Sequence, residues 1–277
     1  MPVRIVQSKQ NLRLKELRRA LAKPCRDAQG LAGIEGPNLL DEALRAGLRL
    51  ATVFVALEAE HLLETLSLPE ETEVLLVPRD LLNQALATET PQPVAALVEP
   101  PNWSWIDVFH ISPKVAPLIV VLAGLQDPGN LGTILRSAEA FGAQAILCLP
   151  ETVSAWNPKA VRASAGSLFR LPLLSVTAED CFARLREEGV KIWTTTIDGA
   201  EATDRIDLVG PVALMIGNEG NGVPEALAAQ ADGAVTIPCP GPVESLNAAI
   251  ATSILLYEAS RQRLATHLSP ARQQSYC

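Results

Sequence analysis

Three loops in the second half of the chain hold the residues whose types and spacing could do chemistry. The loops span residues 124–132, 217–222 and 237–247, are rich in glycine or proline, and each follows an apolar stretch. Ligands of open α/β sheets bind at the carboxyl ends of strands, so loops in these positions predict one shared binding site. None contains the GK[ST] of a phosphate-binding loop, and the glycines do not fit GxGxxG. A nucleotide phosphate is therefore not the expected ligand.

The first loop leads into a predicted helix that carries two candidate functional side chains. Asn130 lies near the start of this helix, and Arg136 follows about one and a half turns later. Both could meet a ligand held by the loop. The alternative is structural, with Asn130 capping the helix and Arg136 pairing with a surface carboxylate.

The second loop combines glycines with one carboxylate. Gly217, Gly220 and Gly222 permit left-handed backbone and the close approach of a ligand. Glu219 between them would repel a phosphate but would tolerate a cation such as a sulfonium. The alternative is a plain turn between a strand and a helix.

The third loop is stiffened by three prolines within residues 238–242. Glu244, Ser245 and Asn247 follow them and could cap the next helix, which is the structural interpretation. Capping alone does not explain why the approach to that helix is so rigid.

Other catalytic and metal chemistry has little support in the sequence. GxSxG is absent, and no histidine lies near the three loops, which argues against a Ser-His-Asp hydrolase and a His-ligated metal. The cysteines form no CxxC pair, so no zinc site is expected. The residues concerned are His61, His110 and His267, and Cys25, Cys148, Cys181, Cys239 and Cys277.

Two α/β segments joined by a linker would position the loops. In the first segment we expect strands at 31–36, 52–56, 73–77 and 93–99, and helices at 37–47, 58–66 and 78–87. A further helix should begin near residue 11 and end before Pro24. In the second we expect strands at 118–123, 143–149, 190–196, 211–217 and 233–238, and helices at 131–142, 157–166, 178–189 and 243–264. The linker, 99–117, holds four prolines and no clean periodicity. Its Trp103 and Trp105 should pack against a domain, with RNA stacking as the alternative.

Charge is distributed unevenly along the chain. The formal net charge of −8 argues against indiscriminate nucleic-acid binding. Residues 1–30, however, carry eight Lys or Arg against two Asp or Glu. This basic segment could contact RNA phosphates, or it could form a solvated helix face.

Several features predict a cytoplasmic protein. No apolar run approaches the roughly 20 residues that cross a bilayer, and the N-terminus lacks the apolar stretch of a secretory signal. The odd number of cysteines favours reduced thiols, as in the cytoplasm.

With the three loops in this order, the sequence resembles the SpoU/TrmH family of RNA ribose 2′-O-methyltransferases. The matching motifs are Asn130-x-Gly132 with Arg136, Ile216-Gly217-x-Glu219-x-x-Gly222, and Ile237-Pro238 through Glu244-Ser245-Leu246-Asn247. VRASAGSLFRLPL, residues 161–173, also resembles a family segment, and the resemblance covers about 118–263. Two positions depart from the family pattern. Cys239 stands where methionine usually follows Ile-Pro, and Asn157 stands in a segment where the family more often has Ser-Pro-Lys.

Residues 8–98 are similar to the family's N-terminal substrate-binding domain, a small α/β fold akin to kink-turn-binding ribosomal proteins. SKQNLRLKELRRAL, GIEGPNLLDEAL and TPQPVAALVE carry this match. The resemblance implies an N-terminal α/β sandwich at 1–98, the linker at 99–117, and an open parallel sheet at 118–277. In that SPOUT sheet the C-terminal segment would be tucked through a loop as a trefoil knot. It also implies a homodimer built through the catalytic domains, with no membrane and no metal.

The resemblance further assigns roles to individual residues. Arg136 would be the catalytic group, with Asn130, Glu219, Ser245 and Asn247 positioning Arg136 and the ribose. The pocket would hold a bent S-adenosylmethionine at Thr195, Gly217, Ile237 and Leu246. RNA contacts are expected at Lys159 and Arg162, and the charge of the basic N-terminal segment predicts further contacts at Arg13, Lys15, Arg18 and Arg19. A guanidinium stays protonated at neutral pH and is a poor base, so we expect Arg136 to bind an RNA phosphate and stabilise the developing alkoxide.

The implied reaction is methyl transfer from S-adenosylmethionine to a ribose 2′-hydroxyl of structured RNA. 23S ribosomal RNA is the expected substrate and transfer RNA the alternative. A non-catalytic ribosome-assembly factor on the same fold is a second alternative, against which the intact Arg136, Glu219 and Asn247 argue. A plain nucleotide-binding α/β protein is the third, and the missing P-loop lysine argues against it.

Overall fold

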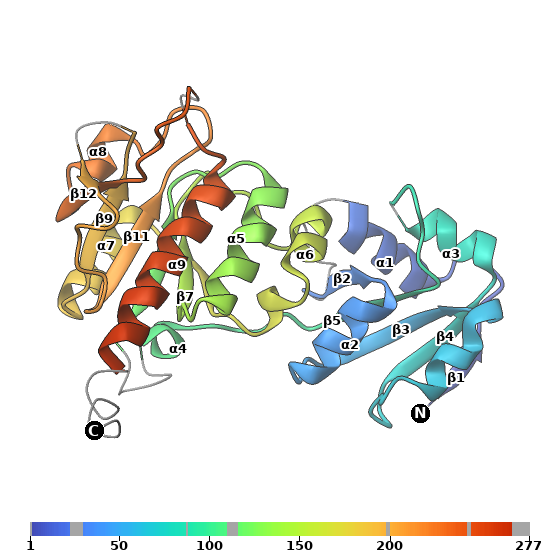
Figure 1. Ribbon diagram of the computed structural model, residues 1–277. Helices are drawn as coiled ribbons and strands as arrows, with labels where there is room; N and C mark the ends of the chain where they lie inside the picture. The colour runs from blue at the N-terminus through green and yellow to red at the C-terminus, as the bar shows by residue number, and fades with distance from the viewer. Residues whose placement is uncertain are drawn as a thin grey trace, which may run out of the picture. The chain divides into compact units, whose positions relative to one another are not determined.

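The computed structural model describes residues 2–22, 30–86, 88–109, 116–197, 200–242 and 245–267 of the 277-residue chain. The chain divides into two compact units, and Figure 1 labels most of their helices and strands. Unit 1 comprises Met1–Asn102 and Ser154–Arg170, and unit 2 comprises Trp103–Val153 and Leu171–Cys277. Residues 154–170 therefore group with the N-terminal unit, whereas the predicted limits count them with the C-terminal domain.

Unit 1 is built on a mixed five-stranded sheet in the order β1-β4-β3-β5-β2. Its strands are β1 (Val3–Ile5), β2 (Ala32–Glu35), β3 (Leu50–Ala56), β4 (Glu73–Val77) and β5 (Val94–Val98). β4 runs parallel to β1 and β3, while β5 pairs antiparallel with β2 and β3. All five residues of β5 are buried, as expected for a strand covered on both faces.

Helices cover this sheet on both faces, with α1 and α3 on one face and α2 on the other (Figure 1). The helical segments of unit 1 are α1 (Leu12–Ala22), α2 (Pro37–Arg45), the 3-10 helix η1 (Leu57–Glu64), α3 (Arg79–Ala85), α6 (Pro158–Ser164) and the 3-10 helix η2 (Ser167–Phe169). α1 buries Leu14, Leu17 and Leu21, which recur at helical spacing. It packs closely on β2, because a Cβ on Gly33 would lie 2.8 Å from Leu21 Cγ.

Unit 2 is a seven-stranded sheet in the order β10-β12-β9-β11-β6-β7-β8, and every pairing between these strands is parallel. Its strands are β6 (Leu118–Leu122), β7 (Ala145–Cys148), β8 (Leu173–Ser175), β9 (Lys191–Thr195), β10 (Glu201–Ala202), β11 (Val212–Ile216) and β12 (Gly233–Thr236). β6 and β11 are central and wholly buried. The expected α/β fold with an open parallel sheet is confirmed, and the trefoil knot stays a prediction.

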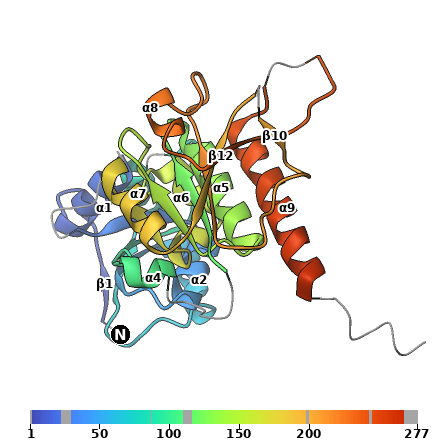
Figure 2. The same ribbon diagram turned by 90° about the vertical axis from the view of Figure 1, so that its left-hand side faces the viewer.

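The helices of unit 2 are α4 (Trp105–Phe109), α5 (Pro128–Ala140), α7 (Ala178–Glu187), α8 (Glu225–Ala228) and α9 (Ala248–His267). α5 and α9 pack against each other, and they run side by side in Figures 1 and 2. α7 packs against the sheet through Phe182 and Leu185, which join alternate residues of β6 in one apolar cluster. Trp103 and Trp105 pack against the same cluster, which confirms the expectation for these two residues. No helix in the described part of the chain has the length and apolar character needed to cross a membrane.

Arg263 fixes the C-terminal part of α9 at the end of the sheet opposite the three loops. Its guanidinium donates to the carbonyl oxygens of Ala116 (2.6 Å), Pro117 (3.1 Å), Leu208 (2.9 Å) and Gly210 (2.8 Å). These carbonyls precede β6 and β11. Burial lowers the pKa of Arg263 below its ordinary value. The side chain supplies donors to four backbone acceptors, a geometry that suits the fork of a guanidinium.

Two predicted helix starts next to the loops are wrong. α5 begins at Pro128 rather than at 131, because the Asp127 side chain caps it by accepting from Asn130 N at 2.8 Å. Asn130 therefore lies in the first turn and is not the cap. α9 begins at Ala248 rather than near 243, and the Asn247 side chain accepts from the first free amides of the helix. Residues 243–244 lie outside the described part of the chain.

Sequence periodicity also missed short elements. The helix expected at 58–66 is a 3-10 helix at 57–64, interrupted by non-helical backbone at Ala59. β1, β8, β10 and α4 span two to five residues each, too few to show a period. α4 lies inside the predicted linker, where Ser104 N and Oγ both donate to Asp107 Oδ2 at 2.7 Å.

Candidate active site

The three loops leave unit 2 from strand ends that lie level with one another. β11 and β6 are neighbours, and their register pairs Ile216 with Leu122, the last residue of each strand. On the other side of β11 lies β9, whose final residue Thr195 pairs with Val235 near the end of β12. The loops that follow β6, β11 and β12 therefore begin at one edge of the sheet, the edge where ligands of such sheets bind.

Glu219 ties the second loop to the first. Its Oε1 accepts from Asn130 Nδ2 at 2.9 Å and from Asp127 N at 3.2 Å, and its Oε2 accepts from Gln126 N at 3.3 Å. All three donors belong to the first loop or to the turn of helix that follows it. The carboxylate thus joins two loops.

The pKa of Glu219 reflects these contacts. Partial burial raises it, but the hydrogen bonds from Asn130 and from the backbone amides of Glu219, Gln126 and Asp127 lower it more, so the pKa lies below the ordinary value for a glutamate. The carboxylate is therefore ionised at neutral pH. The stability that these bonds give is present above the ordinary pKa and is lost as the pH falls through the lowered one.

Asn247 connects the third loop to the same group. Its Nδ2 donates to Asn130 Oδ1 at 3.0 Å, while its Oδ1 accepts from Ala249 N at 2.9 Å and Ile250 N at 3.2 Å. Both ends of the Asn130 amide are thereby used, one by Glu219 and one by Asn247. The structure brings these three predicted site residues into one hydrogen-bonded chain across all three loops.

Gly217 allows the second loop to fold back on itself. A Cβ at this position would lie 2.0 Å from Gly222 C and 2.2 Å from Val223 N. Both atoms are backbone, so no side chain can move aside to make room. Glycine is thus required here for close packing, whereas Gly220 has nothing nearer than Asn218 Oδ1 at 3.4 Å.

The other predicted cofactor contacts surround the same strand ends. Thr195 Oγ1 donates to Met215 O at 3.0 Å, and Ile237 and Leu246 are half-buried. Thr194, beside Thr195, is buried, and its Oγ1 has no hydrogen-bond partner. A buried hydroxyl without a partner at this edge suits a polar ligand that would supply one. Residues 217–222 and 237–242 contain no lysine or arginine, so the loops fit an uncharged base or a cation better than a phosphate.

Two predicted catalytic residues lie apart from the hydrogen-bonded chain. Arg136 is exposed on α5, six residues after Asn130, and forms no ion pair or side-chain hydrogen bond within the described residues. Ser245 is exposed in the third loop. The expectation that Arg136 acts on substrate therefore rests on its exposure and its free guanidinium.

Two of the three described cysteines, Cys148 and Cys181, are buried and do not offer a nucleophile to this site. Burial raises the pKa of Cys148 and of Cys181 to about 12, for Cys181 with a further contribution from Asp180. Neither forms a thiolate at neutral pH. Cys239 is exposed in the third loop between two prolines. Among the residues that the structure describes, no group of three or more His, Cys, Asp and Glu side chains could hold a metal ion.

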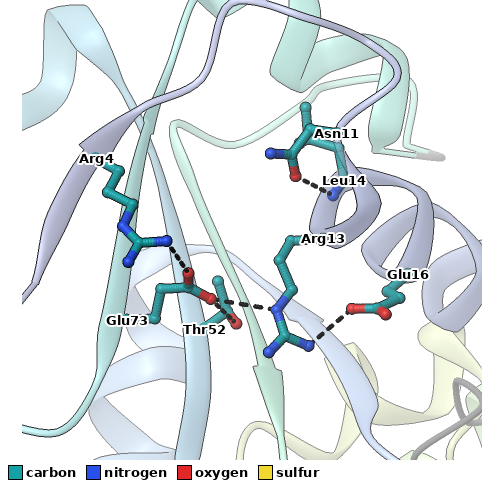
Figure 3. Close-up of polar contacts among 7 residues, drawn as sticks. All are labelled: Arg4, Asn11, Arg13, Leu14, Glu16, Thr52 and Glu73. Carbon is teal, nitrogen blue, oxygen red and sulfur yellow. Dashed lines mark hydrogen bonds and ion pairs between the residues drawn. The ribbon is translucent and has the colours of Figure 1, made fainter.

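Arg13, one of the predicted RNA contacts, is engaged inside unit 1 (Figure 3). It donates to Glu16 Oε2 at 2.9 Å and to Glu73 Oε2 at 3.2 Å. Glu73 also accepts from Thr52 Oγ1 at 3.2 Å and lies 3.9 Å from Arg4 Nη1. The hydrogen bond to Glu16 is the main reason why the pKa of Arg13 is raised. Arg13 therefore ties α1 to β4 and is partly neutralised there.

The other predicted RNA contacts are exposed, and all of them lie in unit 1. Lys15, Arg18 and Arg19 are on α1, and Lys159 and Arg162 are on α6. Asn157 caps α6, because its Oδ1 accepts from Lys159 N at 2.9 Å ahead of Pro158. α6 contacts β2, so cations from both halves of the sequence belong to one compact unit.

Two polar residues at the site were not predicted from the sequence. Asp127 caps α5, and the motif Asp-Pro before a helix is a signal that could have found it. Asn218 contacts the first loop through its side chain, with Nδ2 donating to Gly124 O at 3.0 Å. Nothing in the sequence distinguishes Asn218 from an ordinary turn residue.

Comparison with known proteins gives a family for both parts of the chain. Residues 117–257 match the model of the SpoU rRNA Methylase family, and residues 11–96 match the MRM3-like substrate binding domain. The chain is 33% identical over 258 residues to an uncharacterized tRNA/rRNA methyltransferase of Mycolicibacterium vanbaalenii, covering 87% of this chain and 82% of the relative. It is 30% identical over 256 residues to the 23S rRNA (guanosine(2553)-2′-O)-methyltransferase RlmP of Bacillus subtilis, covering 91% and 97%.

Solved structures are similar over nearly the whole chain. An AdoMet-bound rRNA methyltransferase from Sinorhizobium meliloti is 32% identical with a TM-score of 0.81, covering 97% of this chain and 99% of that one. The SpoU methyltransferase AviRb from Streptomyces viridochromogenes, in complex with the cofactor AdoMet, is 29% identical with a TM-score of 0.79, covering 92% and 99%.

Proposed function

Because this chain belongs to the SpoU rRNA methylase family, we propose that it transfers a methyl group from S-adenosylmethionine to a ribose 2′-hydroxyl of ribosomal RNA. One observation carries the proposal: Asn130, Glu219 and Asn247 join three loops in a single hydrogen-bonded chain at the ligand-binding edge of the sheet. The name of the B. subtilis relative supports 23S rRNA over transfer RNA. Mapping the 2′-O-methylated positions of both RNAs, with and without the gene, distinguishes the two.

The residues around the strand ends fit the proposed cofactor. Gly217, Ile237 and Leu246 would hold the adenosine part through backbone groups and apolar contact, with Thr195 beside them. When bound, S-adenosylmethionine supplies a methyl group that its sulfonium has already activated. The chain's own task is to orient the ribose oxygen and to help remove its proton.

Arg136 is the group that we assign to the reacting phosphodiester. Its exposed guanidinium has the planar two-pronged geometry that suits a phosphate, and it would stabilise the alkoxide that develops on the ribose. The hydroxyl proton would pass by way of that phosphate to solvent water. Asn130, Glu219, Ser245 and Asn247 would position Arg136 and the ribose.

Calorimetry tests the cofactor assignment. We expect the chain to bind S-adenosylmethionine and S-adenosylhomocysteine but not ATP, because the loops provide no lysine to hold phosphates. Gly217→Ala should weaken S-adenosylhomocysteine binding by about tenfold or more, because its Cβ would collide with backbone atoms of Gly222 and Val223.

Gly220→Ala is the matched control in the same loop, since its Cβ meets no atom closer than 3.4 Å. It should bind with nearly unchanged affinity, and circular dichroism should show both variants folded. Tight binding of ATP without binding of S-adenosylmethionine would overturn the assignment.

We propose that the main RNA contacts lie on exposed cations of unit 1. Lys15 and Arg18 are exposed on α1, and Arg162 is exposed on α6. Arg13 differs from them because Glu16 and Glu73 already accept its hydrogen bonds. Arg19 and Lys159 complete the proposed surface.

Neutralising these cations should flatten the salt dependence of RNA binding. For the double variant Lys15→Gln with Arg18→Gln, we expect the slope of log affinity against log salt to fall by about 1.5, since each phosphate contact contributes about 0.7 to 0.9. Arg13→Gln is the contrasting variant. It should leave that slope unchanged but lower thermal stability, because it removes the partner of the buried Glu16. An unchanged slope in the double variant would mean that α1 presents only a solvated face.

We further propose that the chain forms a homodimer through unit 2. α9 exposes Ile250, Ile254, Tyr257 and Leu264, which follow one another at helical spacing. A two-fold dimer would bury such an apolar face against its own copy. Sedimentation of the full chain measures the state, and a single species at the mass of one 29.6-kDa chain would contradict the proposal.

The predicted domain limits stay proposals. They are 1–98 for the RNA substrate-binding domain, 99–117 for the linker and 118–277 for the methyltransferase domain. The two family matches, which end at 96 and begin at 117, support them. Limited proteolysis that cuts first within 99–117 is the expected result, and first cuts elsewhere would revise the limits. An RNA substrate also supports a cytoplasmic location, which cell fractionation tests.

A further inference from the structure

Asn218 is a polar residue at the site to which the proposed mechanism gives no role. It is half-buried two residues after the end of β11, between Gly217 and Glu219. Its Nδ2 donates to Gly124 O at 3.0 Å, and its Oδ1 accepts from Gly220 N at 2.8 Å. One side chain therefore holds the first loop with its donor and the second loop with its acceptor.

The backbone of Asn218 closes the second loop as well. Asn218 N donates to Gly222 O at 3.0 Å, and Gly222 N donates back to Asn218 O at 2.9 Å. This pair of bonds makes residues 218–222 a closed turn, which the close approach of Gly217 to Gly222 reinforces. Glu219 follows directly at the start of this turn, so the placement of Asn218 limits where its carboxylate can reach.

The side chain of Asn218 also extends the pairing of the two central strands. β6 and β11 are in register up to Leu122 and Ile216, and Ala123 N then donates to Ile216 O at 2.8 Å. The next hydrogen bond between these two segments is donated by the side-chain amide of Asn218 to Gly124 O. Just beyond it, Glu219 accepts from the first loop at Gln126 and Asp127.

Asparagine suits this position because it donates and accepts within one short side chain. Aspartate has the same shape, but one carboxylate oxygen would face Gly124 O, and two acceptors repel each other. Alanine would leave both Gly124 O and Gly220 N without these partners. The requirement is thus for an amide, and not for a polar residue in general.

We propose that Asn218 is a positioning residue that sets the first loop against Glu219, so that Asn130 is correctly placed for the reaction. The inference rests on the proposed function for its consequence in catalysis, but its geometric part stands without it. Asn218 itself is not assigned a contact with cofactor or RNA.

Steady-state kinetics test the catalytic part. Asn218→Ala should lower kcat about 10- to 30-fold, as the loss of two side-chain hydrogen bonds would, and change the KM for S-adenosylmethionine by less than about threefold. Asn218→Asp should be no better, because it lacks the donor. Asn221→Ala is the matched control in the same turn, exposed and without a side-chain hydrogen bond in the described structure, and it should keep normal kcat.

A double-mutant cycle separates positioning from a general structural role. If Asn218 acts through Glu219, then adding Asn218→Ala to Glu219→Gln should cost much less than Asn218→Ala costs alone. Fully additive losses, or a kcat for Asn218→Ala equal to that of Asn221→Ala, would overturn the inference.

Hydrogen exchange tests the geometric part without any turnover. The amides of Gln126, Asp127 and Gly220 should exchange faster in Asn218→Ala than in the wild type or in Asn221→Ala. Unchanged exchange at all three would overturn the inference even if kcat fell. If the wild-type chain transferred no methyl group, the proposed function would fail, while faster exchange at these amides would still support the positioning of the loop.

Discussion

Arg136→Ala should lower kcat by about 100-fold or more while leaving the affinity for S-adenosylmethionine within about twofold. Arg136 is exposed on α5 and has no ion-pair partner in the described structure, so its charge is available to an RNA phosphate. The proposed cofactor contacts come from the second and third loops and from β9. The variant therefore removes stabilisation of the reacting phosphodiester and not a cofactor contact. Single-turnover methyl transfer and calorimetry measure the two effects separately.

Replacing Arg136 by lysine tests whether the geometry of the guanidinium matters as well as its charge. Arg136→Lys should not restore turnover, because an ammonium lacks the planar fork that grips two phosphate oxygens. Arg184→Ala is the control, since Arg184 is also exposed on a helix of unit 2 but pairs with Glu187 on the same helix. It should keep normal kcat. Near-normal turnover in Arg136→Ala would reject the role assigned to Arg136.

The sequence was sufficient to predict that the three loops converge, because its motifs lie directly after strands. The apolar runs at 118–122 and 212–216 predicted buried central strands, and the loops after them do meet. Parallel strands place their carboxyl ends at one edge whatever the order of the strands, so convergence follows from the fold class alone.

The hydrogen bonds within the site could not be predicted in the same way. Asn247 and Asn130 are 117 residues apart in the sequence, and Glu219 and Asn130 are 89 residues apart. No local sequence pattern therefore predicts that the side chain of Asn130 bonds to those of Asn247 and Glu219. Asn218 is the clearest case. Its partner Gly124 is a carbonyl 94 residues away, and any polar turn residue would look the same in the sequence.

The burial of charged side chains could not be predicted from the sequence either. Arg13 and Glu16 look like parts of a basic, solvated helix, yet Glu16 is buried and Arg13 bonds to Glu73 on β4. The grouping of residues 154–170 with unit 1 was also not predicted, because it depends on packing. Gly166 lets that segment approach α2, where a Cβ would lie 2.6 Å from Glu42 Cβ. Neither feature leaves a periodic signal.

The acceptor atom is the subject of the second prediction. The buried Cys148 and Cys181, with pKa values raised to about 12, cannot attack a base at neutral pH. The exposed Cys239 is fixed between two prolines in the third loop. The site instead offers an arginine suited to a phosphodiester and small polar groups suited to a ribose. The 2′-hydroxyl, which also distinguishes RNA from DNA, should therefore be the methyl acceptor.

One measurement tests this claim most directly: methyl transfer to an RNA substrate with a single 2′-deoxy nucleotide at the target position. The deoxy substrate should bind within a few-fold of the intact RNA, because every phosphate remains, and it should accept no methyl group. The intact RNA, measured alongside, should be methylated on the ribose. Methylation of the deoxy substrate at a rate like that of the intact RNA would show that the methyl group goes to the base, and would contradict the proposed chemistry.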